Sequence, residues 1–396
     1  MKIVIACDKF KGSLTSSEAN ESISCGFFDY FEREKGSPFV KRPEISSLIM
    51  ADGGEGTLEI FAANKKPGGG EVEEIILSVK DPLLRDISAK YLMCGRRAYI
   101  EMAKASGLAL LNPSEYDPLR ASTYGFGQMI ADAIERGAEE IVCGIGGSAT
   151  NDGGAGMLAA LGFELVGRSG FSVEPGGVGL LDLIEIRCSP AARSLASIKF
   201  ITACDVNNPL LGAEGATRVY SAQKGAGERE MAILERALEN FSGVVCEFAG
   251  EDFRGHPGAG AAGGTGFAML SLLGAELRPG WQVMAEAAGL EERTSSCDLV
   301  VTGEGSLDKQ SLHGKVASGV ADTAGRHNKP LWIFCGVNRL APEEAELLGK
   351  SVKVFSLEEI APDPQTSLKE AKGLLRKISA QAATFLKEIE SNLQNQ

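Results

Sequence analysis

Four acidic residues follow short apolar segments, at positions where carboxylates can do chemistry. Asp8 follows KIVIAC, Asp52 follows LIMA, Asp205 follows KFITAC, and Glu304 follows LVVTG. Each apolar segment is typical of a buried strand, and ligands of parallel sheets bind beyond the carboxyl ends of the strands. Carboxylates at that edge can accept a hydroxyl proton or bind a divalent cation. Capping of turns explains any one of these acids more easily than it explains the set.

Two glycine-rich loops are candidates for binding phosphate. The loop GIGGSATNDGGAG lies between an apolar segment and the helical pattern MLAALG, and it carries Gly146, Gly147 and Ser148. The loop GAGAAGGTG carries Gly263 and Gly264. Glycine lets backbone N–H groups approach phosphate oxygens closely, so we expect both loops to contact a phosphorylated ligand. Tight turns and close helix packing are the alternative role of these glycines.

Three lysines beside glycine or serine are candidates for neutralising an anion. They are Lys11 in FKGS, Lys224 in QKGAG and Lys315 in HGK. Each can place a compact positive charge where the backbone leaves room for an anion. The alternative for each is a solvated surface lysine.

Apolar segments alternate with helical patterns along much of the chain, which predicts parallel sheets with helices on both faces. Residues 86–103 predict a hairpin about Gly95, and the preceding EVEEIILSV is also expected to be extended. Thr15 and Glu18 predict a capping box ahead of the first helix, and Ser367 and Glu370 predict one ahead of a last helix that runs to Ile389. Strands are expected at 2–7, 46–51, 140–144, 198–204, 298–303, 331–336 and 351–357.

The predicted fold class is therefore α/β, with two domains. A Rossmann/flavodoxin-like parallel-sheet domain is expected from both ends of the chain, residues 1–75 and 293–396, and a second α/β domain is inserted as residues 76–292. The segment KKPGGG, residues 65–70, is expected to be a linker.

Composition excludes several classes of protein. The chain has 40 Lys and Arg against 53 Asp and Glu, a formal net charge of −13, which argues against nucleic-acid binding. No apolar segment approaches the length of a membrane span, so we expect no membrane partner. The nine cysteines form no C-x-x-C pair, and the first residues lack a signal-peptide pattern. We therefore expect reduced thiols and a cytoplasmic protein.

Several long motifs together resemble those of the bacterial glycerate kinases of the two-α/β-domain, glycerate 2-kinase-like type. The resemblance extends from Met1 to about Gly336. It departs from the family pattern at Cys7 and Lys9, which flank Asp8, and at Ala317. The motifs are CDKFKGSLTSSEA, ADGGEGT, YIEMAKASGL, GIGGSATNDGGAGML, CDVNNPLLGAEGA, QKGAGE, GAGAAGGTGFAML and TGEGSLDKQSLHGK.

The resemblance implies phosphoryl transfer from ATP to D-glycerate with Mg²⁺, in a cleft between the two domains. It leans toward the 2-hydroxyl as acceptor, and it leaves open whether the protein is a homodimer. The family's signature positions fall here on Asp8, Lys11, Ser13, Asp52, Glu55, Glu101, Asp205, Asn207, Gln223, Lys224, Glu304, Asp308 and Lys315.

Catalytic roles are expected for three of these residues. Lys11 lies at the mouth of the first predicted helix, where a lysine can neutralise an anionic group of glycerate or ATP. One of Asp8 and Asp205 is expected to accept the hydroxyl proton, and the other to help place Mg²⁺.

Two other functions stay open from the sequence alone. Gly144, Gly146 and Ala149 fit a dinucleotide-binding pattern, with Glu164 at about the expected spacing, which would suit an NAD-dependent dehydrogenase. The continuing glycine run TNDGGAG argues against it. The glycine loops alone would also suit a nucleotide-binding regulator without catalytic activity.

Overall fold

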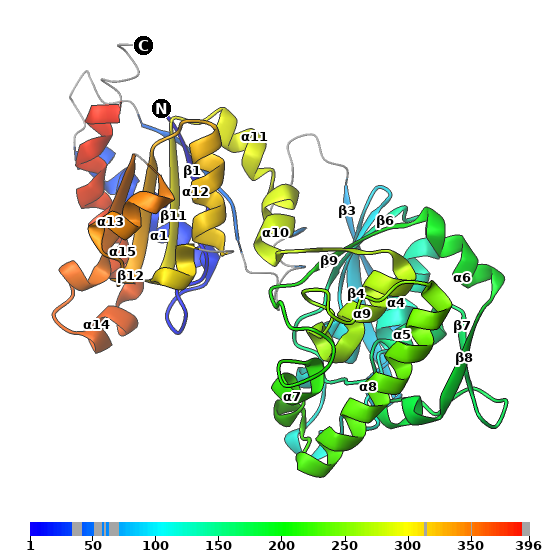
Figure 1. Cartoon of the computed structure of the whole chain (residues 1–396). Helices are drawn as coiled ribbons and strands as arrows, with labels where there is room; N and C mark the ends of the chain where they lie inside the picture. Colours follow the sequence, from blue (N-terminus) through cyan, green and yellow to red (C-terminus); the bar gives the residue numbers. More distant parts are fainter. Residues whose placement is uncertain are drawn as a thin grey trace. The chain divides into compact units, whose positions relative to one another are not determined.

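The computed structural model describes residues 1–33, 42–50, 58, 61–62, 71–312, 315–349 and 351–389. The chain forms two compact units (Figure 1). Unit 1 comprises Met1–Asp52, Ala63–Lys66 and Trp281–Gln396, and unit 2 comprises Gly53–Ala62 and Pro67–Gly280. The domain limits predicted from the sequence, at 75/76 and 292/293, stay a prediction.

Unit 1 is a doubly wound α/β fold. Its five-stranded sheet has the order β13-β12-β11-β1-β2, and every neighbouring pair is parallel. Numbered along the chain within the unit, this is the flavodoxin-like order 2-1-3-4-5, which confirms the predicted fold class. The strands are β1 (Lys2–Ile5), β2 (Glu44–Ser47), β11 (Leu299–Leu307), β12 (Leu331–Asn338) and β13 (Val352–Ser356). The helices are α1 (Ser16–Arg33), α10 (Gly280–Ala288), α11 (Leu290–Ser295), α12 (Val316–Arg326), α13 (Pro342–Ala345), α14 (Pro364–Lys369) and α15 (Ala371–Ala382).

Strand β1 is apolar after Lys2 because both faces of its sheet are buried. Ile3 and Ile5 pack in the core with helices α1 and α15, whereas Val4 packs with α12 in a separate core cluster. Successive strand side chains point to opposite faces, so a central strand of a parallel sheet has no solvent side.

Unit 2 contains a six-stranded sheet of order β10-β9-β6-β5-β4-β3, in which only the pairs β3–β4 and β4–β5 are antiparallel. The predicted hairpin about Gly95 is confirmed as β4 and β5. A separate antiparallel pair joins β7 to β8. The strands are β3 (Val72–Lys80), β4 (Asp86–Cys94), β5 (Arg97–Glu101), β6 (Glu140–Gly144), β7 (Phe163–Gly167), β8 (Leu183–Cys188), β9 (Lys199–Ala203) and β10 (Glu276–Arg278). The helices are α3 (Ala103–Ser106), α4 (Tyr124–Glu135), α5 (Ala155–Ala160), α6 (Pro190–Ser194), α7 (Ala216–Tyr220), α8 (Glu228–Ala249) and α9 (Ala261–Leu273).

Two predicted strands end four residues away from the predicted limit, and most of the others differ from theirs by one or two residues. The strand expected at 46–51 is β2, which ends at Ser47 because its partner β1 ends at Ile5, opposite Ser47. Strand β11 continues to Leu307, so Glu304 lies within a strand rather than after one. Its partner across the ladder is Cys335.

The first predicted helix cap is confirmed and the last is wrong. The Thr15 N–H donates to Glu18 Oε2 at 2.9 Å, and the Glu18 N–H donates to Thr15 Oγ1 at 3.2 Å. The last segment is two helices instead of one, because the backbone leaves helical geometry at Glu370. Asp363 caps the first of them by accepting from the backbone N–H groups of residues 365 and 366.

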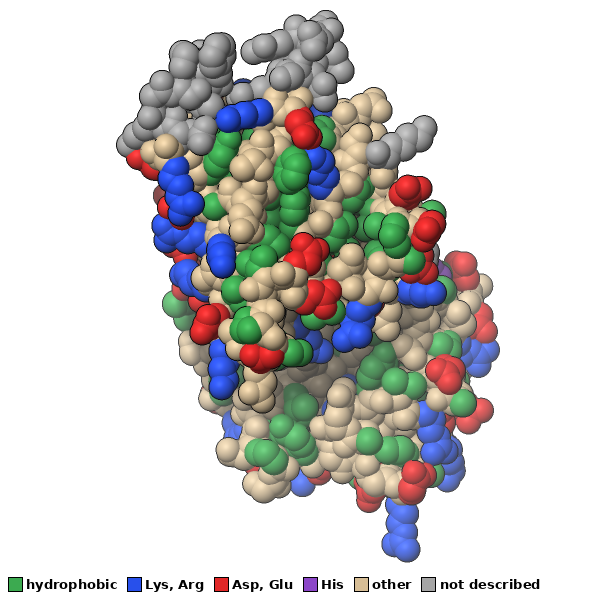
Figure 2. Space-filling model, turned by 90° about the vertical axis from the view of Figure 1, so that its left-hand side faces the viewer, with side chains coloured by type: hydrophobic (Ala, Val, Ile, Leu, Met, Phe, Trp, Pro, Cys, Tyr) green, Lys and Arg blue, Asp and Glu red, His purple; other side chains and the backbone are tan. Residues whose placement is uncertain are grey.

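Charged side chains of both signs lie on the face of the molecule shown in Figure 2. On the face shown in Figure 2, Lys and Arg side chains are interspersed with Asp and Glu, so the described residues of this face form no continuous basic stripe. In the described part of the chain, no helix has both the length and the apolar character needed to cross a membrane.

Candidate active site

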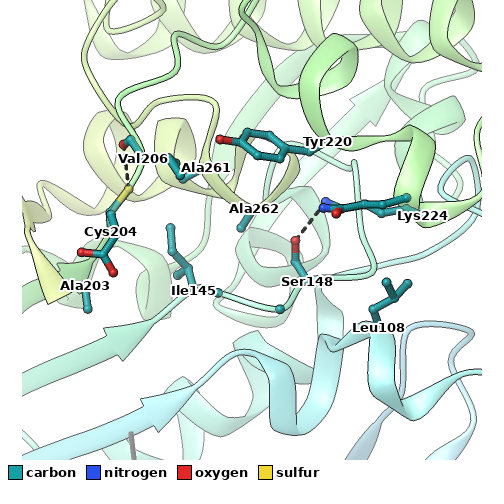
Figure 3. Close-up of a pocket in the computed structure, with 14 residues that line it drawn as sticks. Leu108, Ile145, Ser148, Ala203, Cys204, Val206, Tyr220, Lys224, Ala261 and Ala262 are labelled. Atoms are coloured by element: carbon teal, nitrogen blue, oxygen red, sulfur yellow. Dashed lines mark hydrogen bonds between the residues drawn. The ribbon is translucent and has the colours of Figure 1, made fainter. Parts of the chain in front are cut away.

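Unit 2 contains a pocket of about 340 Å³ at the carboxyl ends of β6 and β9. The loops after these strands, the turn after α7 and the start of α9 form its walls (Figure 3). Gly146, Gly147, Ser148, Asp205 and Lys224 line it, so five predicted site residues from three distant segments lie together. The volume is within the range of small-molecule sites.

The glycines of this pocket provide exposed backbone. Gly146 and Gly147 are exposed, and Gly147 has a φ of 71°, which favours glycine. The Gly147 carbonyl accepts from the Leu108 N–H at 2.9 Å, which anchors the turn on the segment after α3. The bond to Leu108 therefore holds the loop in place, and the backbone of Gly146 and Gly147 lines the pocket.

Lys224 is a buried cation beneath the same loop. Its side chain points toward Ser148 (Figure 3), and its Nζ donates to Ser148 Oγ at 2.9 Å and to the Thr150 carbonyl at 2.6 Å. Lys224 is only 2% exposed. Burial lowers the pKa of its ammonium to about 7, and the charge of Asp152 opposes that shift.

Asp152 fixes the rest of the loop and was missed by sequence reasoning. It is fully buried and accepts from the Thr123 N–H and Oγ1 at 2.8 Å each, and from the Gly154 and Gly156 N–H groups at 3.1 Å each. Burial raises the pKa of Asp152, and these hydrogen bonds oppose the shift. The available signal was an aspartate just before a helix start, where its side chain can bind nearby backbone N–H groups.

Asp205 follows β9 at the wall of the pocket. Its Oδ1 accepts from the N–H of Gly280, the last residue of unit 2, at 2.7 Å. The neighbouring Asn207 is exposed and does not line the pocket. Tyr220 and Gln223 do line it, and Tyr220 donates its hydroxyl to Asn208 Oδ1 at 2.6 Å.

The second group of predicted residues lies in unit 1, at the point where its strand order reverses. Strands β1 and β11 are neighbours there, and the Asp8 N–H donates to the Gly303 carbonyl at 2.8 Å. The turn after Asp8 carries Lys11, which is exposed, and Ser13, whose hydroxyl donates to the Phe10 carbonyl at 3.1 Å. Ligands of open α/β sheets bind at such reversal points.

Glu304 places a buried carboxylate at this edge of the sheet. It is 8% exposed, and within the described ranges its Oε1 has no hydrogen-bond partner. Burial raises the pKa of Glu304 to about 7. Ser311 and Lys315 oppose this rise, whereas the charges of Asp8 and Asp308 add to it. The Glu304 carboxylate therefore interacts electrostatically with four nearby side chains, those of Asp8, Asp308, Ser311 and Lys315.

Asp308 and Lys315 both follow Glu304, on the segment that leads from β11 into α12. Asp308 Oδ1 accepts from the Gln310 N–H at 2.8 Å. Lys315 precedes α12, and its Nζ lies 3.4 Å from Gln310 Oε1. The predicted site residues Asp52 and Glu55 lie outside the described residues.

Gly263 and Gly264 lie in a kink of α9, where they are buried. A Cβ at Gly263 would lie 2.1 Å from the Thr150 carbonyl oxygen, and one at Gly264 would lie 3.0 Å from Gly153 Cα. Both positions therefore allow α9 to pack against the loop after β6. Their predicted contact with phosphate stays a prediction.

The chain matches the model of the glycerate kinase family over residues 3–387. It is 42% identical to the glycerate 2-kinase of Escherichia coli K12 over 338 residues, 85% of each chain. It is also 42% identical to the glycerate kinase of Bacillus subtilis 168 over 340 residues, again 85% of each chain. The chain belongs to the glycerate kinase family. A crystal structure of a Salmonella typhimurium LT2 protein assigned as glycerate kinase 2 has 37% identity, covers 99% of both chains and superposes with a TM-score of 0.82.

Membership of the glycerate kinase family makes the chain an enzyme of the kinase class, as the resemblance predicted. The structure also argues against the dehydrogenase alternative. A dinucleotide-binding acid ends a strand of the same parallel sheet, whereas Glu164 lies on β7, in a separate antiparallel pair.

The two glycine clusters are expected to respond differently to valine. Gly263→Val should destabilise the protein by roughly 1–3 kcal/mol or more, because φ is 68° and the Cβ meets the Thr150 carbonyl. Gly146→Val should leave the melting temperature nearly unchanged and raise KM or lower kcat. Thermal melts and steady-state kinetics check both. A stable Gly263→Val variant with impaired kinetics would instead assign Gly263 to ligand binding.

Proposed function

We propose that this protein transfers the γ-phosphoryl group of ATP to the 2-hydroxyl of D-glycerate, with Mg²⁺ as cofactor. The observation that carries the proposal is the pocket of unit 2, where glycine backbone, Ser148 and buried Lys224 meet the carboxylate of Asp205. The pocket therefore combines hydrogen-bond donors that can bind an anion with a carboxylate, Asp205, that can accept a hydroxyl proton. Family membership and the name of the Escherichia coli relative support the substrate.

The proposed division of labour follows from this chemistry. Phosphoryl transfer depends mainly on positioning and charge neutralisation. The N–H groups of Gly146 and Gly147, with Ser148, would orient an anionic group. Asp205 would accept the hydroxyl proton as the acceptor oxygen attacks. Lys11, exposed in the turn after β1, would neutralise a second anionic group.

The residues present fit a magnesium ion. The described residues include no group of three or more His, Cys, Asp or Glu that would hold a metal alone. Mg²⁺ does not need one, because it is usually bound by one or two carboxylates together with substrate phosphates and water. Glu304, with a buried Oε1 that lacks a partner within the described ranges, and nearby Asp8 would hold it. When bound, it neutralises charge on the transferring group.

An ADP-release assay tests the proposed activity. The protein with Mg·ATP should release ADP only when D-glycerate is present, and chelation of magnesium should abolish release. Glycerate-dependent formation of NADH without ATP would overturn the proposal in favour of a dehydrogenase. Tight ATP binding with no turnover on any hydroxy acid would assign a regulatory nucleotide-binding role.

A further inference from the structure

Lys224 lines the pocket together with Ser148, and the two side chains are hydrogen-bonded to each other. Its ammonium is buried beneath the glycine loop and is bonded to Ser148 Oγ and to the Thr150 carbonyl. The predicted role of Lys224 was direct contact with an anion. Both residues line the pocket, but Lys224 is only 2% exposed and its Nζ already donates to two protein groups, so we expect Ser148 to be the group that meets the ligand.

The Lys224 bond determines what the Ser148 hydroxyl can do. In its charged form the Lys224 amine has only donors, so Ser148 Oγ is then the acceptor in this contact. A serine hydroxyl carries one hydrogen, which then has to find its acceptor elsewhere. Within the described ranges, the structure records no acceptor for it. Ser148 lines the pocket (Figure 3), where a bound molecule would offer such an acceptor.

We propose that Ser148 donates its hydroxyl hydrogen to an anionic oxygen of the bound substrate, and that Lys224 is the positioning residue that orients it. This inference rests on the proposed function. The oxygen belongs to either a phosphate of ATP or the carboxylate of glycerate. Both present the same acceptor chemistry, and the experiment distinguishes them.

The surroundings of Lys224 explain why a buried cation is retained there. An unpaired buried charge is costly, and Asp152 is the buried opposite charge that offsets this cost. An anion in the pocket would add a second favourable charge. Lys224 thus orders the loop and also makes Ser148 Oγ a more polarised donor than an isolated hydroxyl.

A double-mutant cycle in the full chain tests the relay. Ser148→Ala should lower kcat/KM by about 10–100-fold, the loss expected for a hydrogen bond to a charged group. Ser148→Thr keeps the hydroxyl and should restore most of the activity. Lys224→Met should cost much less in the Ser148→Ala background than in the parent, because Lys224 then has no hydroxyl to orient. If Lys224→Met does not fold, Lys224→Leu, which also lacks a donor, replaces it.

The substrate whose KM rises in Ser148→Ala is the one whose oxygen accepts the hydrogen bond from Ser148. A rise for ATP, together with weaker ADP binding in calorimetry, assigns a phosphate, and a rise for D-glycerate assigns the carboxylate. Lys199→Met, an exposed lysine of the same unit, is the matched control and should change neither. Additive losses in the cycle, or an unchanged Ser148→Ala variant, would overturn the relay. An inactive parent protein that still binds ADP through Ser148 would overturn the proposed function alone.

Discussion

Replacing Asp205 with Asn is expected to lower kcat by about 10²–10⁴-fold, the contribution typical of a general base. The fold should survive, because the Asn side chain keeps the oxygen that accepts from the Gly280 N–H at 2.7 Å. Only the proton-accepting ability of the carboxylate is removed. Steady-state kinetics with ATP and D-glycerate, together with a magnesium titration, measure the effect. A base rather than a metal ligand leaves the apparent affinity for Mg²⁺ nearly unchanged.

Two companion variants make this result interpretable. Glu164→Gln changes an exposed acid on β7, outside the pocket, and should keep parental turnover. Asp8→Asn should lower kcat through weaker Mg²⁺ binding. Should the Asp205→Asn variant keep turnover within a few-fold of the parent, Asp205 is not the base. The assignment would then pass to Asp8, Glu304 or Asp308, or to Asp52.

Replacing Glu304 with Gln is expected to stabilise the protein while impairing catalysis. The pKa of Glu304 is raised from 4.5 to about 7, so the folded state disfavours its charged form. The folded parent is therefore unpenalised below pH 4.5, and it loses stability as pH rises from 4.5 to about 7. This difference in pKa corresponds to a loss of about 3 kcal/mol in the free energy of unfolding above pH 7. Gln cannot ionise, so Glu304→Gln should not show that loss.

Thermal melts without magnesium across pH 4.5–8 test this expectation. The melting temperature of Glu304→Gln should rise above that of the parent by several degrees at pH 8 and match it near pH 4.5. Glu343→Gln, an exposed acid of the same unit, should follow the parent at every pH. Parallel curves for the parent and Glu304→Gln would show that Glu304 carries no burial penalty. A stabilised but poorly active variant is the pattern expected at functional sites.

Local sequence patterns predicted helices and strands well where one local interaction, such as burial or helix capping, determines the structure. The segment KIVIAC predicts β1 because a run that is apolar on both faces suits the centre of a parallel sheet. The Thr15 and Glu18 spacing predicts the cap of α1 for the same local reason. The last helix was mispredicted because periodic apolar residues continue across Glu370, where the backbone breaks.

Tertiary packing decided what the sequence could not show. Lys224 beside glycine suggested an anion-binding lysine, but its burial beneath the loop depends on segments far apart in sequence. Gly263 and Gly264 have the composition of a phosphate loop, and their packing against residues 150–153 emerges only when α9 is placed beside that loop. Glu304 was expected after a strand, and pairing with β12 extends β11 past it.

The position of the transferred phosphoryl group tests the central claim most directly. The protein is incubated with Mg·ATP and D-glycerate, and the product is observed by phosphorus NMR with proton coupling. Transfer to the 2-hydroxyl predicts a doublet, because the phosphorus then couples to one proton on the adjacent carbon, and this signal should grow as that of the γ-phosphate declines. A triplet would place the group on the 3-hydroxyl, and inorganic phosphate alone would contradict phosphoryl transfer to glycerate.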